Sequence, residues 1–178
     1  MAIVLTEQLS QISPAALRLA EADFVLRMFR EATKARHDET RFLLTTYFDA
    51  FLFCYVSIEE MVEEASLKSK IQAIPIFSFF KALRNIATHH CVLSGVKGKF
   101  PPPVTRIIKI GGSENAVLCV VPENVEHIFS ELLKIRSWEK KNIDAARAFL
   151  SAQVNRGGDI LVHELMASAI ASVKKYVS

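Results

Sequence analysis

Cysteine is scarce in this chain of 178 residues, and the pattern of the three that occur excludes several classes of protein. Cys54, Cys91 and Cys119 are widely spaced, and no CxxC or Cys/His pair has the spacing of a zinc site. Neither a disulfide framework nor a metal centre is therefore predicted. We interpret the three side chains as reduced, mostly buried thiols of a cytosolic protein.

Long hydrophobic runs and targeting segments are also missing from the sequence. Residues 42–58 come closest to a membrane span, but the stretch is short and carries Asp49 near its centre, so a buried bundle helix is predicted. The first residues show neither a basic region nor a small-residue cleavage site, so no signal peptide is expected. These features predict a cytoplasmic protein without a membrane anchor.

Acidic residues are absent over a long interval, between Glu64 and Glu114. The interval carries a charge of +8, whereas the rest of the chain carries −5. Such segregation favours an anionic partner such as nucleic acid, and the alternative is a basic surface that docks an acidic protein. The eight basic residues are Lys68, Lys70, Lys81, Arg84, Lys97, Lys99, Arg106 and Lys109.

What is present indicates one globular domain over residues 1–178. Apolar residues make up 51% and charged residues 23% of the chain, and 12 phenylalanines predict a core filled by aromatic rings. Apolar periodicity, proline starts and glycine ends predict an all-α, up-and-down bundle of about five helices with an inserted β-hairpin near 104–121. The predicted helices are 14–35, 38–65, 75–94, 123–156 and 159–176, of which 123–156 is either one helix or two joined near 137–138.

Three details of these elements are also predicted. The first helix is expected to bury a stripe formed by Leu17, Ala20, Phe24, Met28 and Ala32. Residues 68–73 are interpreted as a polar loop, and Asp159 as the cap of the last helix.

The helix over residues 77–93 combines an apolar side with a polar stripe. At about 100° per residue, the stripe spans an arc of about 140°. Phe79, Leu83 and Ile86 fall on the opposite side, and His90 falls among them, so His90 is predicted to point into the core. The stripe consists of Lys81, Arg84, Asn85, Thr88 and His89.

The run Arg84-Asn85-Ile86-Ala87-Thr88-His89 resembles the R-x4-H signature of HEPN domains, in which a polar residue, often Asn, follows the Arg. HEPN domains are all-α bundles, and many are metal-independent ribonucleases of toxin–antitoxin, abortive-infection and CRISPR systems. The resemblance therefore implies an RNA substrate, a homodimer in which two signature helices face each other, no cofactor and no metal, and an antitoxin protein as a partner.

The resemblance also implies roles for individual residues. His89 would act as general base or acid and Arg84 as the phosphate clamp, with Asn85 orienting the histidine or the phosphate. Lys81 and Thr88 would be auxiliary phosphate contacts. The basic loop that follows would add Lys97 and Lys99, and an acid of the preceding helix, Glu59 or Glu60, would lie near the Arg/His pair.

The same residues allow readings without catalysis. Arg84 could pair with Glu60 or Glu63 as a structural salt bridge, and His89 could be an exposed histidine at a helix end. The chain would then be a catalytically silent HEPN-like bundle that binds nucleic acid or a protein, or a helical module that uses the stripe as a dimer contact. His37, His127 and His163 lie on separate segments and are interpreted as surface or core residues. Ala167 stands where an HExxH zinc motif would need its second histidine.

Overall fold

The computed structural model describes residues 12–34, 40–93, 103–109 and 116–177. These residues form a predominantly α-helical bundle with a small two-stranded antiparallel hairpin, which confirms the predicted fold class. The elements are α2 (Pro14–Lys34), α3 (Thr40–Met61), α4 (Ala65–Gln72), α5 (Pro75–Leu93), β1 (Thr105–Lys109), β2 (Ala116–Val120), α6 (Pro122–Ile135), the 3₁₀ turn η1 (Ser137–Glu139), α7 (Lys140–Asn155) and α8 (Val162–Val177).

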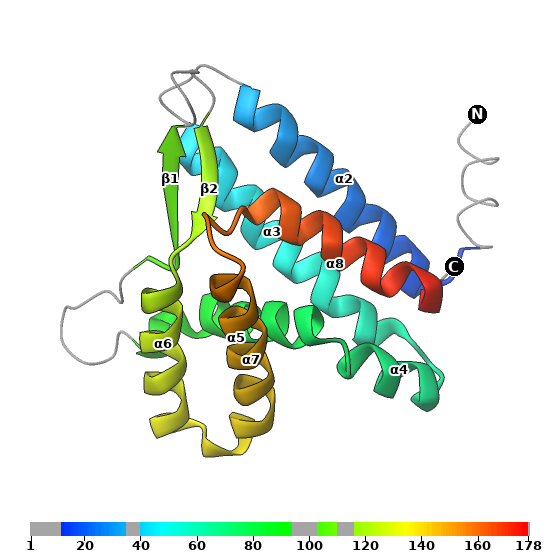
Figure 1. Ribbon diagram of the computed structural model, residues 1–178. Helices are drawn as coiled ribbons and strands as arrows, with labels where there is room; N and C mark the ends of the chain where they lie inside the picture. Colours follow the sequence, from blue (N-terminus) through cyan, green and yellow to red (C-terminus); the bar gives the residue numbers. More distant parts are fainter. Residues whose placement is uncertain (1–11, 35–39, 94–102, 110–115, 178) are drawn as a thin grey trace.

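The helices form two groups with α5 between them (Figure 1). In one group α2 packs along α3, and α8 runs beside both. In the other, α6 and α7 form an antiparallel pair joined by η1. α5 contacts α3 on one side and α7 on the other, so it is the helix that joins the two halves of the bundle.

Aromatic rings fill the core around α5, as the phenylalanine content predicts. Phe80 packs edge-on against Phe51 and Tyr55, with ring centroids 5.5 Å apart in both pairs. Phe77 lies 5.4 Å from the Tyr55 ring, and Phe79 lies 5.2 Å from Phe149 of α7. Full burial of each such ring stabilises the fold by about 2 to 3 kcal/mol, so α5 is fixed firmly in place.

α3 meets the length and apolar content of a membrane span over Phe42–Met61, and it is the one such helix among the described residues. Half of that window is buried inside the bundle, where Phe51, Tyr55 and Ile58 are inaccessible to solvent. The helix therefore packs as the central bundle helix that the sequence predicts.

The hairpin has the predicted position and is tied to the chain before α8. Thr105 pairs with Val120 and Lys109 with Ala116. On its other side β2 forms a bridge between Cys119 and Leu161, and the Val120 amide donates to the Ile160 carbonyl at 2.9 Å. This pairing follows a reversal at the end of α7, where two consecutive glycines at 157 and 158 have φ values of 79° and 77°.

The buried face predicted for α2 is wrong for most of its members. Leu17 and Phe24 are exposed, whereas Ala22, Leu26 and Phe29 are buried against α3 and α8. Both stripes are apolar, so periodicity alone does not choose between them, and the positions of the neighbouring helices decide which stripe is covered.

Two boundaries also differ from the prediction, and one alternative is settled. Residues 65–72 are helical, not a loop, because the buried Ile71 anchors α4 despite its polar composition. The stretch 123–156 is two helices, broken at Arg136, whose φ of −131° and ψ of 64° are not helical. Asp159 does not cap the last helix, because Ile160 and Leu161 pair with β2 first and α8 begins at Val162.

Candidate functional site

The polar stripe of α5 lies at the surface of the bundle. Lys81, Arg84 and Asn85 are partly exposed, while Phe79 and Leu83 are buried on the other side of the helix. The burial pattern thus agrees with the helical wheel over the first half of the stripe. Pro75 starts the helix where its missing amide costs nothing, and the aromatic contacts described above set the rotation of α5.

Lys81 is held by a buried carboxylate. Its Nζ lies 2.6 Å from Oε2 of Glu59, whose side chain is only 6% exposed. Gln72 of α4 donates a second hydrogen bond to the other oxygen of Glu59. Because both oxygens are satisfied and a cation neutralises the charge, Glu59 is tolerated in the interior.

Arg84 has two partners on α3. Its Nη1 donates to Oε1 of Glu60 at 2.8 Å, and its guanidinium carbon lies 5.6 Å from the centroid of the Phe53 ring. The ring of Phe53 also carries Arg18 of α2, whose guanidinium carbon is 5.8 Å from the centroid. Arg18 in turn pairs with Glu21 at 2.6 Å. Phe53 therefore lies near cations from two different helices.

Asn85 lies at the other edge of the polar stripe from Arg84 and faces the turn between α6 and α7. Its Nδ2 donates to Oε2 of Glu139 at 2.8 Å, and Arg136 pairs with the other oxygen of Glu139 at 3.3 Å. Trp138, the neighbour of Glu139, is 75% exposed. The side-chain amide of Asn85 is thus oriented by an acid 54 residues away in the sequence.

Several predicted residues lie outside what the structure describes. The backbone of α5 continues as helix to Leu93, but the side chains of Thr88, His89 and His90 are not among the described ones. Lys97 and Lys99 lie outside the described residues altogether. The described part of the site therefore consists of Lys81, Arg84 and Asn85 with their partners Glu59, Glu60, Glu139 and Phe53.

In the folded structure, acids from other elements lie next to cations of the acid-free interval. Lys81 pairs with Glu59, Arg84 with Glu60, and Arg106 with Asp159 at 2.9 Å. Acids from elements outside the interval thus offset part of its positive charge. An anionic ligand of α5 has to compete with carboxylates that are already in contact with the cations.

Sequence reasoning named Glu59 and Glu60 but missed Phe53, Arg18, Trp138 and Glu139. A wheel of α3 carries one usable signal, because Phe53 and Glu60 are seven residues apart and lie on the same side of the helix. Arg18 and Glu139 reach the site from other elements, and no local pattern in the sequence predicts their positions.

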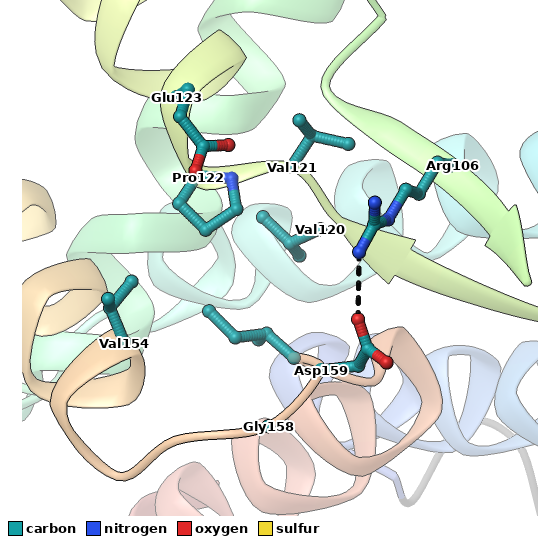
Figure 2. Close-up of a pocket in the computed structure, with 9 residues that line it drawn as sticks. Arg106, Val120, Val121, Pro122, Glu123, Val154, Gly158 and Asp159 are labelled. Atoms are coloured by element: carbon teal, nitrogen blue, oxygen red, sulfur yellow. Dashed lines mark hydrogen bonds and ion pairs between the residues drawn. The ribbon is translucent and has the colours of Figure 1, made fainter.

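A separate cavity of about 240 Å³ lies beside the hairpin (Figure 2). The Arg106–Asp159 pair closes one side, and Val120, Val121 and Pro122 line another. Cys119, on the adjoining strand, has no exposed surface, and burial raises the pKa of its thiol to about 11.

The remaining ionisable groups do not assemble a metal centre within the described ranges, where no cluster of three His, Cys, Asp or Glu residues occurs. Burial also lowers the pKa of His163, whose Nδ1 is buried without a hydrogen-bond partner in the structure. Burial, with Glu21 nearby, raises the pKa of the Cys54 thiol. These groups are therefore neutral near pH 7, as structural residues are.

No family model matches the chain, and no curated protein or solved structure matches it.

Proposed function

We propose that this chain is a metal-independent endoribonuclease of the HEPN type, which cleaves RNA where Arg84 and His89 of two copies line one cleft. The observation that carries the proposal is the position of Arg84. Its side chain is partly exposed at the surface of the bundle, five residues before the position of His89, on a helix whose opposite side is buried. A clamp for phosphate has to meet its ligand from such a position.

The chemistry needs no group beyond the RNA and these side chains. The 2′-oxygen of a ribose forms a bond to the adjacent phosphorus, and the bond from phosphorus to the 5′-oxygen breaks. One imidazole takes the proton of the 2′-hydroxyl, and a second imidazole gives a proton to the leaving 5′-oxygen. The guanidinium groups stabilise the charge that develops on the phosphate, and the products are a 2′,3′-cyclic phosphate and a free 5′-hydroxyl.

One copy holds a single R-x4-H motif, so the proposal includes a homodimer about a two-fold axis. It also includes a role as a toxin or defence component in the cytoplasm, restrained by an antitoxin protein. Sedimentation of the purified chain tests the dimer, and a monomer at the concentrations of the cleavage assay would contradict it.

A second candidate is a catalytically silent HEPN-like module that binds nucleic acid or a protein. The pairing of Lys81 and Arg84 with Glu59 and Glu60 favours it, because both cations already have a structural function. Binding of RNA without cleavage would be the result expected from this candidate.

The two candidates are separated by incubating purified protein with several RNAs in excess EDTA. The proposal predicts cleavage, cyclic-phosphate ends, and a loss of about 10²- to 10⁴-fold in rate for His89→Ala. Arg84→Gln is expected to lose activity as well. His127→Ala is the matched control, because His127 is an exposed histidine on α6 that contributes nothing to the proposed cleft. Intact RNA with the wild-type chain, or equal rates for His89→Ala and His127→Ala, would overturn the enzyme.

A further inference from the structure

Phe53 is one of two exposed phenylalanines of α3, the other being Phe42 near the start of the helix. Phe48, Phe51 and Tyr55 of α3 are buried in the core, but Phe53 is 53% exposed. Its ring is not bare, since Arg18 approaches it from α2 and Arg84 from α5. The ring therefore contributes little to the core and instead holds two guanidinium groups in place by cation–π attraction.

Acids limit the directions from which an anion can approach this ring. Asp49 is exposed one turn before Phe53 on α3, and Glu60 is exposed two turns after it. The cations stand to the sides, on α2 and α5, and each is paired with an acid, Arg18 with Glu21 and Arg84 with Glu60. A chain of phosphates that crosses α3 from Arg18 toward Arg84 replaces these acids on the two cations, whereas a chain that runs along α3 approaches acids without a cation of the site to bind.

Trp138 belongs to η1, the turn that contacts the Asn85 edge of the same stripe. Asn85 binds Glu139, and the indole of the adjacent Trp138 is 75% exposed. Each of the two elements that bind the Arg84–Asn85 pair therefore carries an exposed aromatic residue, Phe53 on α3 and Trp138 on η1.

We propose that Phe53 and Trp138 are stacking platforms for bases of a single-stranded RNA that crosses α5 between them, with Arg18 and Arg84 binding its phosphates. Aromatic faces beside cations bind single strands without reading sequence, because every base has a flat face to stack. Paired bases are already stacked inside a duplex, so double-stranded RNA is excluded. This inference rests on the proposed function, since it assigns the form of RNA that the Arg84 site takes.

Binding is measured with a fluorescent, 2′-O-methylated oligoadenylate of about twelve nucleotides, at about 50 mM salt where phosphate contacts are strong. The methyl group blocks the nucleophile, so the probe stays intact. We expect Phe53→Leu and Trp138→Ala each to weaken binding by about tenfold, and Phe53→Tyr to retain it. A probe of equal length without bases should bind the wild-type chain as weakly as the variants do.

Phe24→Leu is the matched control. Phe24 is 54% exposed and carries a guanidinium, that of Arg27, 5.7 Å from its centroid, but no described contact links its ring to α5. Trp138 is the single tryptophan of the chain, so quenching of its emission by the oligonucleotide reports stacking directly.

The outcomes separate the two proposals. If the wild-type chain binds the probe and Phe53→Leu binds it equally well, the stacking proposal is refuted and the ribonuclease proposal is unaffected. Tight binding with no cleavage of ordinary RNA would overturn the ribonuclease and leave the platforms standing. If Phe53→Leu changes the sedimentation mass instead of the affinity, the ring belongs to a contact between copies and the platforms are overturned. A wild-type chain that binds no probe overturns the platforms, and the cleavage assay in EDTA then decides on the ribonuclease separately.

Discussion

The guanidinium of Arg84 donates to the carboxylate of Glu60 at 2.8 Å, across the line where α5 meets α3. The two residues differ in exposure, since the Arg84 side chain is mostly covered and the Glu60 side chain is 53% exposed. Glu60 can therefore turn into solvent, and an incoming phosphate can take its place on Arg84. The RNA of the proposed function would therefore have to compete with this acid for Arg84.

The first prediction concerns removal of that competitor. Glu60→Gln should bind the non-cleavable oligonucleotide about three- to tenfold more tightly at low salt, because one competing charge is lost. Its free energy of unfolding should change by less than about 1 kcal/mol, since the pair is largely exposed on the acid side. Fluorescence anisotropy and urea unfolding measure the two effects. Glu63→Gln makes the same change of net charge three residues later, and an equal gain there would show that Arg84 is not involved.

The second prediction concerns Lys81 and Glu59, a pair that is mainly structural. Lys81→Met should lower the free energy of unfolding by about 2 kcal/mol, because it leaves the buried carboxylate of Glu59 without its cation. The double variant Lys81→Met/Glu59→Leu should recover most of the loss. Urea unfolding measures both, and a loss in the single variant no larger than that of Glu60→Gln would contradict the structural role.

The third prediction follows from His163. Burial places the pKa of its imidazole in the folded chain below the ordinary 6.5. The unfolded chain then binds more protons as the pH falls, so stability decreases from about pH 6.5 down through the folded-state pKa and is unaffected by this group above that range.

Replacement of the imidazole should remove this dependence. Between pH 7 and pH 5, at the same ionic strength, the free energy of unfolding should fall less for His163→Leu than for the wild-type chain. Thermal unfolding across that interval measures it. His127→Leu, at an exposed position, serves as the control, and parallel curves for His163→Leu and wild type would refute the assignment.

The fourth prediction concerns the thiol of Cys119. With a pKa of about 11 and no exposed surface, it should resist iodoacetamide at pH 8 in the folded protein, because the thiolate is the reactive form. Peptide mapping after alkylation measures the label at each cysteine. In denaturant all three cysteines of the chain should react, and rapid native labelling of Cys119 would show that the hairpin opens readily.

Local signals in the sequence predict most of the element types, and the exception is α4, whose polar residues predict a loop. Pro14, Pro75 and Pro122 each stand at the start of a helix, and the β-branched runs near 104–121 form the predicted hairpin. The errors arise where two local solutions are equally good. In α2, Leu17 and Phe24 offer a stripe as apolar as that of Leu26 and Phe29, and only the packing partners distinguish them.

The candidate site, too, could be predicted from the sequence only in part. Helical geometry brings Lys81, Arg84 and Asn85 to one side of α5, because positions three and four residues apart lie on the same face of a helix. Their surroundings depend on contacts between elements. Glu139 approaches Asn85 from 54 residues away, and Arg18 reaches Phe53 from another helix, so neither neighbour could be predicted from a motif.

The pairing of Ile160 and Leu161 with β2 affects how the chain can associate. On one side β2 pairs with β1 over its length, and on the other the returning segment covers its end at Cys119 and Val120. A strand from another molecule cannot pair with β2 at that end. On β1 such a strand would approach the charged Arg106, a residue type that natural proteins place on edge strands to prevent this pairing.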